Sequence, residues 1–92
     1  MNMSLDKIVD AIKEVCKNNN VKHLYLFGSY AKGNAHKGSD IDIVVKGVDN
    51  ISRLKEDIEN IPTLETIDVF NYEMCKNPYL KEDIDKYAKV IY

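Results

Sequence analysis

Hydrophobic residues at the start of the chain recur every three or four positions, which is the spacing of one face of an α-helix. The pattern covers residues 4–18, with charged side chains between, and its apolar face comprises Leu5, Ile8, Val9, Ile12, Val15 and Cys16. Ser4 belongs to the residue types that cap helix N-termini, and the asparagines at 18–20 tolerate the left-handed conformation that closes a helix. We therefore predict an amphipathic helix over residues 4–18.

Three short apolar runs predict β-strands in the rest of the chain. The first covers residues 22–27, in which Leu24, Tyr25, Leu26 and Phe27 are almost continuously hydrophobic, as is typical of a strand covered on both faces. Residues 40–46 begin with alternating aspartate and isoleucine, and residues 64–70 form the third run. Residues 28–39, between the first two strands, contain three glycines and predict a turn, a short helix and a loop.

Two further helices complete the pattern. A helix with the buried stripe Leu54, Ile58 and Ile61 follows potential caps at positions 49, 50 and 52, and Pro62 ends it. Asn77-Pro78 predicts a turn before a helix over 79–90, with Leu80, Ile84, Tyr87 and Ile91 at helical spacing. Helices alternating with strands indicate an α/β (α+β) fold, and the length indicates one domain over residues 1–92.

Composition narrows the class of protein without identifying it. The chain is 45% hydrophobic and 30% charged, as in ordinary globular domains, and its net charge of −2 weighs against a nucleic-acid partner. No apolar run approaches the ~18 residues of a membrane span, and no signal peptide is visible. Cys16 and Cys75 match no metal spacing and are expected to be free thiols, which suits the cytoplasm.

The turn after the first strand contains a glycine–serine pair that could hold a phosphate group. Gly28 would let the backbone approach a phosphate closely, and a helix beginning there would direct free N–H groups at the anion. The Ser29 hydroxyl adds a hydrogen-bond donor. Lys32, Lys37 and Lys46 are candidates to neutralise phosphate, of which Lys32 is the strongest because it lies within one turn of Ser29. By itself such a pair is more often an ordinary turn.

Three aspartates lie in or beside the predicted second and third strands. Asp40 and Asp42 are two residues apart, so their side chains should point to the same face of one strand. Asp68 lies mid-strand, where an uncompensated charge is costly, and it can face the same cleft if the two strands are neighbours. Carboxylate oxygens are the ligands that Mg²⁺ prefers, and three could hold two ions around a triphosphate. Turn capping or an edge position would explain the aspartates without a metal.

Taken together, these residues resemble a known signature. Gly28-Ser29, ten intervening residues, Asp40-Ile41-Asp42 and then Asp68 are similar to the signature of the polymerase-β-like nucleotidyltransferase superfamily. The residues in and around the motif resemble those of the minimal nucleotidyltransferases, which are prokaryotic proteins of about this size. The resemblance covers residues from about 5 to 92.

The resemblance implies a fold, a site and a partner. The fold would be the polymerase-β-like nucleotidyltransferase fold, a small mixed β-sheet flanked by helices. Gly28 and Ser29 would hold the triphosphate of ATP, Asp40 and Asp42 would bind two Mg²⁺ ions, and Asp68 would complete the metal site and help to deprotonate the acceptor hydroxyl. Characterised minimal members act as antitoxins by transferring AMP to a tyrosine of a HEPN-class toxin. We therefore expect an Mg²⁺-dependent protein adenylyltransferase.

Two other interpretations stay open at this point. The chain could be a binding module that masks its toxin by surface contact, with a vestigial nucleotide site. It could also be a nucleotidyltransferase with a small-molecule or RNA-end acceptor. The net charge weighs against RNA, and 92 residues leave no room for the acceptor-binding domains of the larger relatives.

Overall fold

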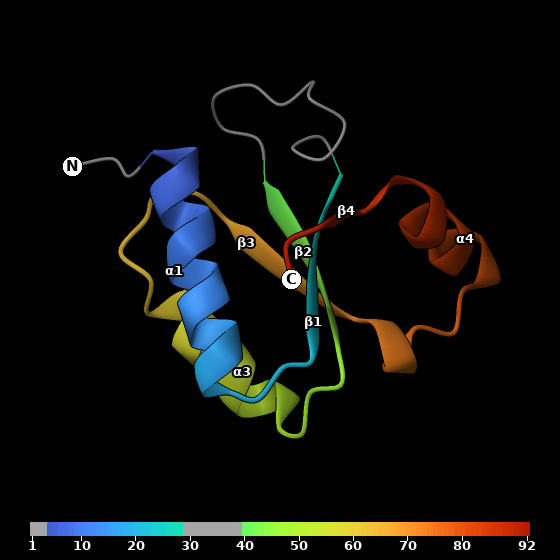
Figure 1. Cartoon of the computed structure of the whole chain (residues 1–92), viewed down its shortest axis with the longest axis horizontal. Coiled ribbons are helices and arrows are strands. Elements are labelled where there is room, and N and C mark those ends of the chain that lie inside the picture. Colours follow the sequence, from blue (N-terminus) through green and yellow to red (C-terminus); the bar gives the residue numbers. More distant parts are fainter. Residues whose placement is uncertain (1–3, 29–39) are drawn as a thin grey trace.

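The computed structural model describes residues 4–28 and 40–92, which form a four-stranded mixed sheet with helices around it (Figure 1). The strand order is β3-β2-β1-β4, in which β1 is antiparallel to both β2 and β4 and β2 is parallel to β3. The elements are α1 (Leu5–Asn18), β1 (His23–Phe27), β2 (Ile41–Lys46), α3 (Ile51–Glu59), β3 (Ile67–Asn71), the 3₁₀ turn η1 (Tyr72–Met74), α4 (Pro78–Tyr87) and β4 (Lys89–Val90). The mixed sheet and its flanking helices confirm the expected fold class.

Both helices that cover the sheet begin at the expected caps. The Ser4 side chain accepts a hydrogen bond from the Lys7 backbone N–H at 3.4 Å, and the Asn50 side chain accepts one from Arg53 at 3.0 Å. Each cap satisfies a backbone donor that has no partner within the helix. Asn20, just after α1, has a φ of 58°, so the predicted left-handed residue ends this helix.

The core lies between one face of the sheet and the pair α1 and α3, which lie side by side in Figure 1. Its sheet residues alternate along the strands, as the period of two requires, and they meet the apolar faces of both helices. The cluster comprises Ile8, Ile12, Cys16, Val21, Leu24, Leu26, Ile41, Ile43, Val45, Leu54, Ile58 and Ile61. The expectation that the first strand is covered on both faces is wrong, because Tyr25 and Phe27 on its second face are only half-buried.

The third strand and the last helix differ from their predicted ranges. β3 begins at Ile67 rather than at residue 64, and Leu64 is 85% exposed. α4 ends at Tyr87 because Ala88 is extended, with a ψ of 136°. Ile91 therefore does not belong to the apolar stripe of the helix. It pairs with β1 instead, where its N–H donates to Leu24 O at 2.8 Å.

Two further sequence expectations can be compared with the structure. Cys16 and Cys75 are both free thiols, as expected, with Cys16 completely buried. Within residues 4–28 and 40–92, no helix is both long and apolar enough to cross a membrane.

Candidate active site

Two of the predicted aspartates lie opposite each other on neighbouring strands. Asp42 in β2 and Asp68 in β3 are register partners in the parallel pair, so their side chains leave the sheet on the same face. The flanking residues Ile41 and Ile43 enter the core beneath the helices, and Ile67 and Val69 pack against that core. Both carboxyl groups therefore lie on the face of the sheet opposite α1 and α3, where they are half-buried.

Asp40, the remaining predicted aspartate, lies one residue before β2 and is exposed. Its charge still acts on the pair, because the pKa of Asp42 is raised by partial burial first, then by the charges of Asp68 and Asp40, and by a hydrogen bond with Asp68. Burial and neighbouring negative charge both disfavour the ionised carboxylate. The structure thus brings Asp42 and Asp68 together and places Asp40 close enough to repel Asp42.

The backbone of Gly28 closes one side of this acidic cluster. Gly28 follows β1, whose last residue Phe27 pairs with Asp42, and it has a φ of +72°. A Cβ atom at this position would collide with Oδ2 of Asp42 and lie 3.3 Å from its Cγ. Only glycine combines this left-handed conformation with such a close approach at no steric cost. Ser29 and Lys32, the other residues predicted to hold phosphate, lie outside the described residues, so their roles stay predictions.

The chemistry of the donor set fits a hard divalent cation. Asp42 and Asp68 supply carboxylate oxygens on one face of the sheet, and in the described part of the chain no basic side chain forms an ion pair with either. Within that same part, however, no group of three or more potential ligands is arranged to hold a metal ion. Asp42 and Asp68 are therefore the two residues best placed to hold a cation. The role of Asp40 as a ligand stays a prediction.

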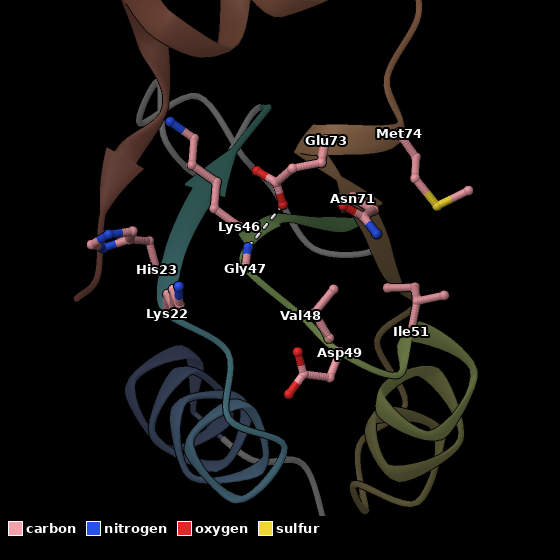
Figure 2. A pocket seen from close by; sticks show the side chains of 10 residues that line it. All are labelled: Lys22, His23, Lys46, Gly47, Val48, Asp49, Ile51, Asn71, Glu73 and Met74. Carbon is pink, nitrogen blue, oxygen red and sulfur yellow. Dashed lines mark hydrogen bonds between the residues drawn. The ribbon is translucent and has the colours of Figure 1, made fainter.

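A cavity of about 630 Å³ lies at the other end of β2, away from the aspartates (Figure 2). It is bordered by the starts of β1 and α3 and by the ends of β2 and β3, and Glu73 accepts a 2.8 Å hydrogen bond from the Gly47 N–H across it. Lys46 lines this cavity, with its Nζ 4.1 Å from the centroid of the Tyr72 ring and 5.0 Å from that of Tyr25. The expectation that Lys46 could neutralise a phosphate bound at Gly28 is therefore not supported, since it lies at the opposite end of β2. No local pattern in the sequence predicts this cavity, because its lining comes from three distant stretches of the chain, residues 22–23, 46–51 and 71–74.

Comparisons with known proteins agree with this geometry. The family model described as "Polymerase beta, Nucleotidyltransferase" matches residues 10–92. A protein of Methanocaldococcus jannaschii, named "Putative protein adenylyltransferase MJ1379", is 34% identical over 94 residues, which cover 87% of this chain and 94% of that protein.

Two solved structures share the fold. A toxin-antitoxin crystal structure with AMP-PNP superposes with a TM-score of 0.69 at 24% identity, covering 90% of this chain and 71% of that chain. A variant of the toxin-antitoxin MntA-HpeT superposes with a TM-score of 0.71 at 24% identity, covering 99% of this chain and 73% of that chain. At this identity the two structures show the fold alone.

Proposed function

This chain belongs to the polymerase beta nucleotidyltransferase family, and from that membership we propose that it transfers AMP from ATP to a hydroxyl group of a partner protein. The observation that carries the proposal is the pairing of Asp42 with Asp68 beside the backbone of Gly28. A relative that is 34% identical and bears a protein adenylyltransferase name supports a protein as the acceptor.

The proposed partner is a toxin of the HEPN class, with this chain as its antitoxin and one of the toxin's tyrosines as the acceptor. The support is that both fold-similar structures are toxin-antitoxin complexes, one of them with a nucleotide analogue. We further propose that the pair acts in the cytoplasm, and that residues 1–92 form a single catalytic domain.

Each residue of the site has a proposed task in the transfer. The acceptor oxygen attacks the α-phosphorus of ATP while its proton passes to Asp68, and the bond to pyrophosphate breaks. Gly28 and Ser29 hold the triphosphate through the backbone and the hydroxyl group, and Lys32 balances its charge. Asp40, Asp42 and Asp68 are the proposed ligands of Mg²⁺, which when bound neutralises charge on the phosphates and lowers the pKa of the attacking hydroxyl.

A transfer assay tests this function directly. The chain is incubated with α-labelled ATP, Mg²⁺ and a HEPN-class toxin as the candidate acceptor, and the label on the toxin is measured. We expect labelling by the natural chain and a loss of at least a hundredfold for Asp42→Asn, by analogy with the loss of one group that stabilises transition-state charge, which typically costs about 10²–10³ in rate. Asp83→Asn, which removes an exposed carboxylate on α4, is the matched control.

The same variants separate catalysis from simple masking of the toxin. If Asp42→Asn abolishes labelling but still neutralises the toxin in cells, the chain acts by contact and the proposed transfer is not its function. Labelling that survives Asp42→Asn and Asp68→Asn would rule out the proposed site.

A further inference from the structure

We propose that the free edge of β3 binds the acceptor-bearing segment of the substrate protein as an added β-strand. The inference rests on the proposed function, since it says how the acceptor hydroxyl reaches the aspartates. The proposed occupant is an extended, basic segment that carries a hydroxyl residue.

Within residues 4–28 and 40–92, no other backbone pairs with the outer edge of β3. β3 is the last strand of the order β3-β2-β1-β4, and within the described residues no strand lies beyond it. On its inner side, Thr66 O accepts a 2.8 Å hydrogen bond from the Ile41 N–H. Because backbone groups of successive residues in a strand point to opposite sides, those of Ile67, Val69 and Asn71 point away from β2. These donors and acceptors can pair with an incoming strand.

Of the features that usually prevent strand addition, the edge has one charged residue, Asp68, and no lysine, proline or bulge. The strand reads Ile-Asp-Val-Phe-Asn and pairs in unbroken register with β2. Phe70 on this strand is 37% exposed. The other edge of the sheet, β4, has only two residues and offers much less backbone for pairing. Strand addition therefore favours β3.

Among the described residues, three grooves run beside this edge: one, lined by Val69, Phe70 and Asn71, has Lys55 and no acidic side chain, and the other two are lined by Asp68. Those two have volumes of about 290 and 350 Å³, and Glu59 also lines both. Glu65 adds a third acidic group to the larger of the two, and Lys55 in the smaller is the one described basic residue that lines either. An acidic lining of this kind is complementary to a segment with lysine or arginine beside the acceptor residue.

The register would bring the acceptor next to the candidate active site. Neighbouring strands lie about 4.8 Å apart, so a residue opposite Asp68 on an added strand would present its side chain on the face that carries Asp42 and Asp68. Cross-strand neighbours at this spacing are within reach of long side chains such as tyrosine. Asp68 would then lie at the boundary between the enzyme and the bound acceptor segment.

Two substitutions at Val69 separate the backbone of the edge from its side chain. Val69→Pro removes an N–H that points away from β2, a place where edge strands tolerate proline. Val69→Ala keeps that N–H and is the matched control. With a HEPN-class toxin as the probe, we expect Val69→Pro to weaken binding at least tenfold and Val69→Ala less than threefold. Calorimetry with ATP and Mg²⁺ should give equal affinities for both variants, which shows that the site is intact.

Hydrogen exchange gives a second measurement that is independent of transfer. On addition of the probe, the amides of Ile67, Val69 and Asn71 should become protected. Protection without labelled product would refute adenylyl transfer and leave strand addition standing. Unchanged exchange at these amides, or equal binding by both Val69 variants, would overturn strand addition whether or not AMP is transferred. Protection that grows with concentration of the chain alone would identify a second copy as the occupant, and would also overturn it.

Discussion

Asp42 and Asp68 face each other across two parallel strands, at the same register position and on the same face of the sheet. Partial burial, followed by the charges of Asp68 and Asp40, raises the pKa of Asp42. Two adjacent carboxylates of this kind repel each other unless a proton or a cation lies between them. The pair therefore makes the stability of the fold depend on both pH and metal.

In the absence of metal, the free energy of unfolding should fall as the pH rises. The folded chain holds the Asp42 proton more tightly than the unfolded chain, so folding is favoured at low pH and this advantage is lost as the pH rises from 3.8 through the raised pKa. Asp42→Asn should remove this dependence and stabilise the chain at pH 7 by roughly 0.2–1 kcal/mol, the range for cross-strand charge pairs. Urea unfolding in EDTA at several pH values measures it. A profile for Asp42→Asn that runs parallel to that of the natural chain would contradict the prediction.

Mg²⁺ bound between Asp42 and Asp68 should replace their destabilising repulsion with a net stabilisation of the folded chain. A cation that binds the folded chain and not the unfolded one raises the melting temperature by mass action. We expect Mg²⁺ to stabilise the natural chain, to leave Asp42→Asn and Asp68→Asn nearly unchanged, and to strengthen ATP binding that is weak in EDTA. Thermal melts and calorimetry with and without EDTA provide the measurement. ATP affinity that is the same in EDTA and in Mg²⁺ would argue against the metal site.

Gly28→Ala and Gly47→Ala form a matched pair at the two ends of β2. Both glycines have left-handed φ values, +72° and +70°, so each alanine should cost about 1–2 kcal/mol of stability. A Cβ at Gly28 would also collide with Asp42, whereas one at Gly47 would meet the side chain of Lys22. We therefore expect only Gly28→Ala to reduce nucleotide binding beyond what its loss of stability explains. Equal nucleotide binding by the two variants would show that the approach of Gly28 to Asp42 has no role.

Asn19 joins the two helices that cover the sheet. Its side-chain amide donates to Val15 O at 2.9 Å and to Asp57 Oδ2 at 3.0 Å, and the residue is 8% exposed. Asn19→Ala should lower the free energy of unfolding by about 1–2 kcal/mol, because Asp57 loses a partly buried partner. Asn18→Ala, at the exposed last position of α1, should change it by less than about 0.5 kcal/mol. Denaturant unfolding compares the two.

Local signals in the sequence were sufficient for most of the fold. The capping residues Ser4 and Asn50 and the buried positions of α1 and α3 are set by neighbours within a few positions, and the structure confirms them. Ile61 is the exception, because α3 ends at Glu59 and this residue of the predicted stripe lies beyond the helix. The sequence predicted that Asp68 would face the same cleft as Asp42 only if the second and third strands were neighbours, and nothing local in the sequence settles that. Parallel pairing of β2 and β3 meets that condition.

The features that were not predicted depend on contacts between distant segments. Residues 89–90 look helical from their local spacing, but their backbone groups pair with β1, which a local pattern cannot reveal. Lys46 appeared to be a candidate phosphate ligand because it lies near the motif in sequence. Its place at the far end of β2, between two tyrosine rings, is decided by the direction of the strand.

The pairing of β1 with β4 has a consequence for the order in which the chain folds. On this edge Leu24 O accepts hydrogen bonds from the N–H groups of Ile91 and Tyr92, and the Leu24 N–H donates to Tyr92 O at 3.1 Å. The Tyr92 hydroxyl donates to Val21 O at 2.9 Å. During synthesis, β1 therefore emerges first and keeps one open edge until the last strand of the sheet has left the ribosome. An open strand edge is a template for pairing with other chains. A product that stops after α4 should retain its hydrophobic core and yet aggregate, because its first strand would have no neighbour on that side.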